Sequence, residues 1–168
     1  MNRALDKIEA TLKVEPKHAE AIAWRGATVF FQSGQAFQKQ DTRKGMELYM
    51  RAMADFDQAG KLAPDSLGVL IPRAAVLMSA AVGAKGNPMA KQWVSTTVAD
   101  YERVLEMQKD TFAGLGEHAR GELLQGLANG YRLLDDEANA NLILSGFRRR
   151  CRPRPMPSVR RSGLRPRR

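Results

Sequence analysis

Histidine and acidic side chains are the residues of this chain best suited to binding a metal or transferring a proton. His18 and His118 are the only histidines, and neither is followed at i+4 by a second histidine or by a cysteine, as helical zinc motifs require. A solvated or helix-capping histidine is therefore favoured. The acidic run 135–137 (Asp135, Asp136, Glu137) lies between two expected helices, where a turn and a helix N-cap explain it better than a metal site does. The sequence predicts no metal and no cofactor.

Nucleophilic chemistry has no local signature either. The patterns GxxxxGK[ST], GxGxxG and GxSxG, which mark phosphate-binding loops and the nucleophile elbow, do not occur. Cys151 is the only cysteine, so no intramolecular disulfide can form, and no nearby histidine is expected to activate its thiol. We therefore predict a protein that is not an enzyme, and an enzyme with an unrecognised site remains the least favoured alternative.

The positive charge of the chain is confined to its C-terminal end. The formal net charge is +9, yet residues 148–168 hold 10 Arg and no acid, which leaves 17 basic against 18 acidic residues in the range 1–147. Long-range attraction to phosphate is therefore not expected from residues 1–147. Binding to nucleic acid or to another acidic surface is predicted only through the Arg-rich tail.

Hydropathy predicts neither a membrane span nor a signal peptide. No run of about 18 apolar residues occurs, and the N-terminal residues 1–7 read as a charged amphipathic helix rather than a secretory signal. A cytoplasmic protein is expected. If the true start lies upstream, an export signal could precede this sequence.

Apolar spacing of the helical kind recurs along the chain, whereas strand-like alternation is scarce, which predicts an all-α fold of about seven helices. The first ends at Pro16 and the second runs from about His18 to Ser33. The polar stretch 33–45 is either a long loop or an extension of the second helix by a turn or two. Asp41 or Thr42 is the expected cap of the third helix. The fourth begins after Ser66 or at Pro72, 83–88 is a break, and the seventh starts near Asp136.

Two residue patterns alternate along these helices. One pattern closes on proline at Ala52-x3-Phe56-x2-Ala59-x4-Pro64, and 48 residues earlier the same spacing occurs at Ala4-x3-Ile8-x2-Thr11-x4-Pro16. A degenerate copy is Thr97-x3-Tyr101-x2-Val104-x4-Lys109. The helices before these carry the second pattern: Ile22-x2-Arg25-Gly26-x2-Val29, Leu70-x2-Arg73-Ala74-x2-Leu77 and Leu124-x2-Leu127-Ala128-x2-Tyr131. Two alternating helix types predict stacked helical hairpins, in which small residues let neighbouring helices approach closely.

These patterns resemble the tetratricopeptide repeat, in which a small residue separates apolar positions in one helix and Ala-x3-Phe precedes a closing proline in the next. The resemblance covers roughly residues 1–145, although matched positions recur every 48, 45 and 43 residues rather than about every 34. Long connections between helices would absorb this difference. The resemblance implies an α-solenoid over residues 1–147 with a concave groove that receives a peptide or helix of another protein.

Candidate binding residues follow from the same resemblance. The i, i+3, i+7, i+10 spacing of Glu122, Gln125, Asn129 and Arg132 places them on one helix face, which the resemblance directs into the groove. The corresponding positions of the second helix are Glu20, Ala23, Ala27 and Phe30. A plain solvated face is the alternative.

Aromatic residues have two interpretations. A platform for ligands is one, and its members would be Phe30, Phe31, Phe37, Tyr49 and Phe56. Core packing is favoured, because Tyr49 and Phe56 lie on a helical stripe that also holds Ala52 and Met53. Trp24 and Trp93 lie beside the main stripes, which is compatible with a groove wall or with contact to a neighbouring hairpin.

The segment 148–168 has the composition of a disordered tail, with 10 Arg and 4 Pro and too little apolar surface to fold. It is either a basic arm for nucleic acid or the product of a shifted reading frame, since GC-rich coding sequence read out of frame is dominated by Arg and Pro. The abrupt loss of helical register near Gly146 favours the shifted frame.

Overall fold

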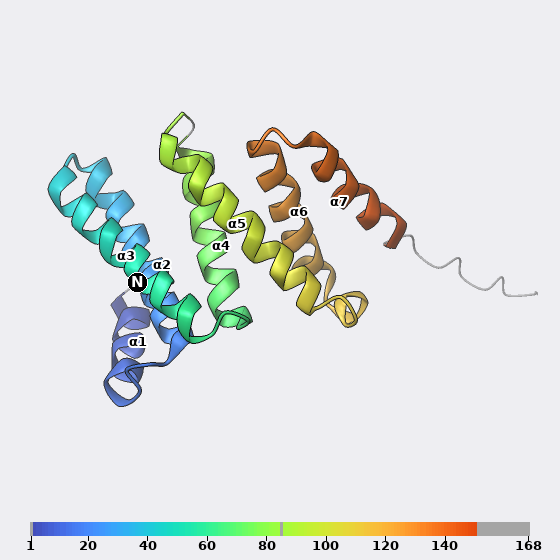
Figure 1. The fold of residues 1–168 in the computed structure, drawn as a ribbon. Coiled ribbons are helices and arrows are strands. Elements are labelled where there is room, and N and C mark those ends of the chain that lie inside the picture. The colour runs from blue at the N-terminus through green and yellow to red at the C-terminus, as the bar shows by residue number, and fades with distance from the viewer. Residues whose placement is uncertain (1, 85, 151–168) are drawn as a thin grey trace, which may run out of the picture.

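Seven α-helices make up the fold in the computed structural model, which describes residues 2–84 and 86–150, and the side chains of 3–84 and 86–145 (Figure 1). No strand occurs in these residues, so the predicted all-α class and the number of helices are confirmed. The elements are α1 (Asn2–Val14), α2 (Ala19–Gln38), α3 (Thr42–Leu62), α4 (Leu67–Gly83), α5 (Pro88–Met107), the short 3-10 helix η1 (Phe112–Gly114), α6 (Glu117–Leu133) and α7 (Glu137–Arg150).

Side-chain caps define where several helices begin. The backbone N–H of Ala21 donates to Nδ1 of His18 at 3.2 Å, and that of Lys44 donates to Oδ1 of Asp41 at 3.1 Å. Asp136 accepts the N–H of Asn139 at 3.0 Å. Each cap satisfies a backbone donor that has no partner within the helix. The capping roles predicted for His18, Asp41 and Asp136 are therefore confirmed.

Three helix boundaries resolve alternatives or correct the prediction. Helix α2 continues to Gln38, so the stretch after Ser33 extends the helix and is not a long loop. Helix α4 begins at Leu67 and contains Pro72, whose ring is buried. Helix α7 reaches Arg150, so the domain boundary expected at residue 147 falls inside a helix. The predicted disorder of the tail and the state of Cys151 concern residues 151–168, which lie outside the described residues.

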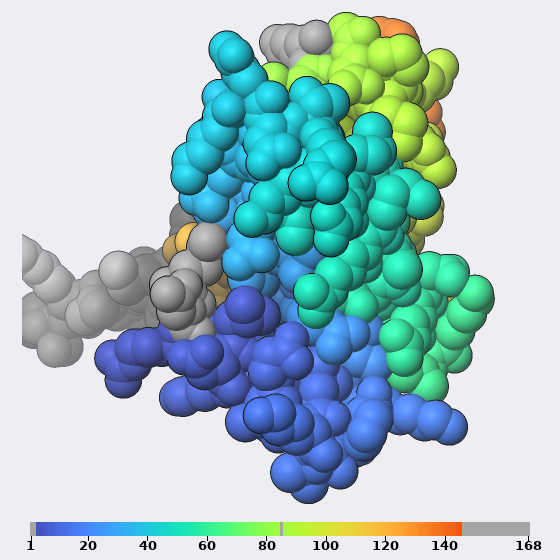
Figure 2. Space-filling model, turned by 90° about the vertical axis from the view of Figure 1, so that its left-hand side faces the viewer, coloured from blue at the N-terminus to red at the C-terminus, as the bar shows by residue number. Residues whose placement is uncertain are grey.

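Consecutive helices pack as antiparallel pairs, α2 with α3, α4 with α5 and α6 with α7 (Figure 1). Neighbouring pairs meet where α2 contacts α4 and α5 contacts α6, while α1 packs on α2. Figure 2 views the molecule from the side of α1, α2 and α3, where α1 lies below the α2–α3 pair. The hairpins therefore lie side by side in the order in which they occur in the sequence.

The predicted repeat positions are largely core positions. Ala52, Phe56 and Ala59 of α3 are buried, and Pro64 is exposed just after the end of this helix. A Cβ on Gly26 would lie 3.0 Å from the ring of Phe56, so a side chain at this position of α2 would require that ring to shift by a few tenths of an ångström. At the other named positions, Tyr101 and Tyr131 are half-buried.

Core packing was the wrong prediction for two of the aromatic residues. Phe56 and Phe30 are 1% and 8% exposed, but Phe31 and Phe37 are 55% and 41% exposed. Phe31 is one position from buried Phe30 and therefore points to another side of α2, and Phe37 lies in the last turn of this helix.

Candidate functional site

The face predicted on α6 is largely solvated. Glu122, Gln125 and Arg132 are exposed and Asn129 is half-buried. Gln125 donates from Nε2 to Oδ1 of Asn129 at 3.0 Å, so two of the four side chains satisfy each other. Glu122 lies 3.3 Å from Nε2 of His118, and Arg132 lies 3.7 Å from Glu137. These local contacts fit the solvated-face alternative and leave the binding role a prediction.

The corresponding positions on α2 do not form an open groove, which corrects that prediction. Ala23 and Ala27 are 0% and 6% exposed, and they pack in clusters that include Val69 and Leu77 of α4. The physical reason is that α2 and α4 close on each other along the face that the resemblance assigns to the groove. No partner can reach these two alanines in this arrangement.

Glu20 and Phe30, the other two positions of that set, have different roles. The carboxylate of Glu20 accepts a hydrogen bond from Oγ of Ser66 at 2.7 Å and lies against Gly68, where an added Cβ would meet it at 2.3 Å. Glu20 thus places negative charge at the N-terminus of α4, which stabilises that helix. Phe30 is buried but its ring borders a cavity.

That cavity is the candidate site that we consider first. It lies between the C-terminal ends of α2 and α4 and the N-terminal ends of α3 and α5. Its volume of about 640 Å³ is within the range of ligand-binding sites. We call it the inter-hairpin groove. Its lining consists of Phe30, Ser33, Gly34, Phe37, Gln38, Met46, Tyr49, Ser79, Ala80, Gly83, Ala84, Asn87, Met89 and Trp93.

Three aromatic rings from three helices form the floor of the inter-hairpin groove. The ring centroid of Phe30 lies 5.9 Å from that of Tyr49 and 5.7 Å from that of Trp93, both edge to face. Trp93 donates from Nε1 to the hydroxyl of Tyr49 at 3.3 Å, which satisfies a donor that burial would otherwise leave unpaired. Trp93 therefore contacts the neighbouring hairpin, one of the two alternatives that its sequence position allows, and it also lines the inter-hairpin groove, whereas Trp24 is 53% exposed on α2.

The rim of the groove exposes large apolar side chains. Phe37, Met46 and Met89 are 41%, 50% and 37% exposed. Methionine is flexible and polarisable, and it adapts to partner surfaces of different shape. None of the lining residues is charged. The rim is thus suited to contact with an apolar surface.

Two glycines keep the groove open. A Cβ built on Gly34 of α2 or on Gly83 of α4 would meet no atom within 4 Å. Glycine costs about 1 kcal/mol relative to alanine inside a helix, and packing does not require it at Gly34. A larger residue at Gly34 would therefore project into open space and fill the groove without disturbing the core.

The polar side chains of the groove are mostly committed to structure. Ser33 donates from Oγ to the carbonyl of Phe30 at 2.8 Å, and Oδ1 of Asn87 accepts the N–H of Met89 at 2.9 Å. Among the described residues, no group of three or more His, Cys, Asp or Glu side chains could hold a metal ion. What the groove can do is bind apolar groups.

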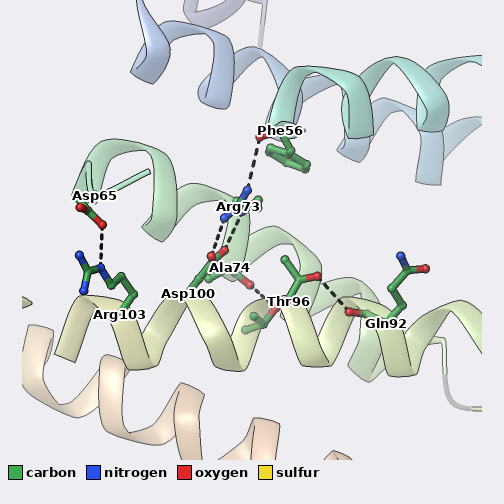
Figure 3. A network of polar contacts seen from close by, with 9 residues as sticks. Phe56, Asp65, Arg73, Ala74, Gln92, Thr96, Asp100 and Arg103 are labelled. Atoms are coloured by element: carbon green, nitrogen blue, oxygen red, sulfur yellow. Dashed lines mark hydrogen bonds and ion pairs between the residues drawn. The ribbon is translucent and has the colours of Figure 1, made fainter. Parts of the chain in front are cut away.

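Buried charge lies away from the groove, between the two helices of each of the first two hairpins. Arg25 of α2 pairs with Asp55 of α3 through Nε and Nη2 at 2.9 and 2.8 Å. Arg73 of α4 pairs with Asp100 of α5 in the same two-bond geometry, at 2.8 and 2.6 Å. Figure 3 shows Arg73 pointing also to the carbonyl of Phe56 in α3, at 3.4 Å. Arg73 therefore ties its own hairpin to the preceding one.

Hydrogen bonding and burial shift the pKa values of side chains in these pairs. The hydrogen bond to Asp55 raises the pKa of Arg25, and the hydrogen bond to Asp100 raises the pKa of Arg73. Burial raises the pKa of Asp100, and this effect outweighs the opposing hydrogen bond from Arg73. Such partners stabilise each other inside the fold, so a structural role explains them without any catalytic one.

Comparison with known proteins gives no relative for this chain. Neither a protein family model, nor a curated protein, nor a solved structure matches the chain. In the part of the chain that the structure describes, no helix combines the length and the hydrophobicity needed to cross a membrane. The function is therefore inferred from the site itself.

Proposed function

We propose that this chain is a protein-binding scaffold, and that its inter-hairpin groove receives a segment of another protein. The observation that carries the proposal is the uncharged groove of about 640 Å³ with Phe37, Met46 and Met89 exposed at its rim. Exposed apolar side chains around a concave site commonly mark a recognition surface. Recognition without catalysis fits a lining whose polar groups cap helices and bond to backbone.

The proposed architecture is a stack of hairpins of the tetratricopeptide kind, and the buried ion pairs support it. Arg25 and Arg73 precede the small residue of one pattern, while Asp55 and Asp100 precede the aromatic residue of the other. In the last hairpin the same two positions hold Leu127, which is buried, and Ile143, which packs against the same core cluster. The first two hairpins thus hold a charged pair, and the third holds an apolar pair at the equivalent positions, as expected for copies of one repeating hairpin.

Affinity capture with the full chain tests the proposal. Gly34→Leu is designed to fill the groove, and Gly121→Leu on α6 is the matched control, because an added Cβ there also meets no atom within 4 Å. We expect the wild type and Gly121→Leu to retain the same partners from a lysate of the source organism, and Gly34→Leu to lose them. Equal capture by all three chains would exclude the groove as the binding site.

The face on α6 is tested in the same assay. Replacing Gln125, Asn129 and Arg132 together by alanine keeps residues compatible with a helix. Loss of capture in this triple variant but not in Gly34→Leu would place binding on α6.

The Arg-rich tail provides an alternative function, binding to nucleic acid or another acidic surface. Ten arginines in residues 148–168 support it, while the rest of the chain is nearly neutral. Raising salt from about 50 to 200 mM weakens phosphate binding by orders of magnitude. Capture that disappears over this range and ignores Gly34→Leu would favour the tail.

A further inference from the structure

The junction between the second and third hairpins is more open than the junction between the first and second. At the first junction α2 packs along α4, which buries Ala23 and Ala27 of α2. The repeated pattern places Ile71 and Ala75 of α4 at the equivalent positions. Ile71 is nevertheless 43% exposed, and Ala75 is exposed too, because α6 packs mainly on α5 and barely reaches α4. The second junction therefore leaves apolar surface uncovered.

A cavity occupies this gap between α4 and α6. Its volume is about 190 Å³, and its walls come from α4, α5, α6 and the connection between α5 and α6. We call it the α4–α6 pocket. Most of its lining is apolar, with Ile71, Val104, Leu115 and Leu123 as the large side chains. Since an apolar cavity of about 150 Å³ holds one benzene molecule, this pocket can take an apolar body of about that size.

The polar side of the α4–α6 pocket is acidic. Its polar lining residues are Tyr101, Gln108 and Glu122, and none of the described residues that line it is basic. Glu122 lies 3.3 Å from His118 of the same helix, but its side chain is 72% exposed, so a ligand can reach the carboxylate. Burial raises the pKa of Tyr101, and the charge of Glu122 raises it further. The negative potential of Glu122 therefore extends to the phenol that lines the pocket.

This combination favours a cation with an apolar body. A positive group gains from the carboxylate of Glu122 and from the electron-rich face of the Tyr101 ring. An anion would be repelled by Glu122. A ligand that is polar throughout would lose hydration against Ile71 and Leu123 without gaining hydrogen bonds there.

We propose that the α4–α6 pocket binds an amine whose apolar body is about the size of a benzene ring and whose single ammonium group pairs with Glu122. The body lies between Ile71 and Leu123. This inference goes beyond the proposed function, because the pocket shares no lining residue with the inter-hairpin groove. Two sources carry this chemistry, a free amine and the lysine side chain of a polypeptide, and the experiment separates them.

Four small molecules test the inference by nuclear magnetic resonance titration of the isotope-labelled full chain, in which backbone shifts report weak binding at known residues. Benzylamine carries the proposed chemistry. Benzyl alcohol has the same shape without the charge, and benzoate has the opposite charge. Lysine blocked at both backbone ends represents a polypeptide side chain.

Two variants change the pocket, and each has a matched control. Glu122→Gln removes the charge, and Glu117→Gln makes the same change at an exposed position of α6 that does not line the pocket. Ala75→Leu fills the pocket from an exposed position of α4, and Ala54→Leu makes the same change at an exposed position of α3. Leucine and glutamine both favour helix, so the fold should be retained.

We expect benzylamine to shift the amides of the pocket residues and to bind about fivefold more tightly than benzyl alcohol, the upper range for an ion pair at the surface. Benzoate should not bind. Glu122→Gln should remove the preference for benzylamine, and Ala75→Leu should abolish binding of both, while the two controls bind as the wild type does. Blocked lysine that binds as tightly as benzylamine would identify a polypeptide as the source, and blocked lysine that does not bind would identify a free amine.

Absence of shifts at the pocket with benzylamine, equal preference in Glu122→Gln, or binding that survives Ala75→Leu would each overturn the inference. None of these outcomes bears on the proposed function, which is tested by capture with Gly34→Leu at the other junction.

Discussion

The buried pair of Arg73 and Asp100 makes a quantitative prediction, because the last hairpin holds leucine and isoleucine at the same positions. The two side chains are 18% and 5% exposed and share two hydrogen bonds of 2.8 and 2.6 Å. Removing one partner leaves a buried charge without its counter-charge. Either Arg73→Leu or Asp100→Ile alone should therefore destabilise the fold by about 3–5 kcal/mol.

The double variant should behave differently. Arg73→Leu with Asp100→Ile reproduces the Leu127 and Ile143 pair, and exchanging a whole buried ion pair for apolar residues is commonly neutral or stabilising by about 1–4 kcal/mol. We expect a free energy of unfolding within about 1 kcal/mol of the wild type, or higher. The shorter leucine also vacates space beside Gly60, where an added Cβ would lie 2.9 Å from Nη1 of Arg73. Adding Gly60→Ala should therefore recover further stability.

The pKa of Asp100 sets how this comparison depends on pH. Burial raises it in the folded state above the ordinary value of 3.8. The contribution of Asp100 to stability is then fully present below that value and declines as pH rises through the folded pKa. The double variant, which lacks this group, should gain on the wild type as pH rises from about 3 to 7.

Urea denaturation followed by circular dichroism measures the free energy of unfolding of the wild type, the two single variants and the double variant. An unchanged m-value shows that each variant unfolds in the same way. The exposed pair of Asp57 and Lys61, 65% and 75% exposed, is the control, and its removal should change stability by less than about 1 kcal/mol. A double variant that costs the sum of its two single variants would refute the reasoning, because the two charges would then be energetically independent.

Other expectations follow from burial and local geometry. Phe56→Ala should lower the free energy of unfolding by about 3–5 kcal/mol, because the ring is 1% exposed; an unchanged urea midpoint would contradict this. Gly34→Ala should raise stability by up to about 1 kcal/mol, since its Cβ meets nothing within 4 Å, and a lower midpoint would show hidden crowding. Burial and the hydrogen bond to Glu102 raise the pKa of Tyr131 to about 12, so its contribution to stability should persist to pH 10 and be lost as pH rises through 12. Phenolate absorbance should show this late titration, and Glu102→Gln should shift it to lower pH.

Much of the fold could be predicted because local patterns act within single helices. Apolar spacing located the helices, and the spacing around Ala52, Phe56 and Ala59 identified positions that the structure buries. The sequence allows two ends for α2, because Gly34 lowers helix propensity while Gln and Lys after it favour a helix. The spacing of Phe30, Gly34 and Phe37 at i, i+4 and i+7 was the signal that the helix continues.

The site was harder to predict because it depends on how whole helix pairs are arranged. Ala23 and Ala27 match groove positions of the resembling repeat, yet contact between α2 and α4 buries them. Met46 and Met89 carry no local signal, since an exposed methionine and a buried one occur in similar sequence. Met46 and Met89 form part of the groove rim only because the ends of the α2–α3 and α4–α5 hairpins are separated.

The feature that separates this sequence from the resembling repeat also explains where the groove lies. Matched positions recur after 48, 45 and 43 residues instead of about 34, and the sequence suggests that long connections absorb the difference. The structure instead lengthens the helices: α2 and α3 have 20 and 21 residues, and only residues 39–41 join them. Helix α2 therefore continues about three turns beyond Gly26.

The inter-hairpin groove is built on that extension. Its lining residues on α2 are Phe30, Ser33, Gly34, Phe37 and Gln38, all C-terminal to the pattern that packs the hairpins together. The repeated positions thus maintain the core, and the added helical turns supply the groove with buried residues such as Phe30 and partly exposed ones such as Phe37. Because Gly34 lines the groove and an added Cβ there would meet no atom within 4 Å, a groove-filling change such as Gly34→Leu can remove binding while the repeat positions keep the fold.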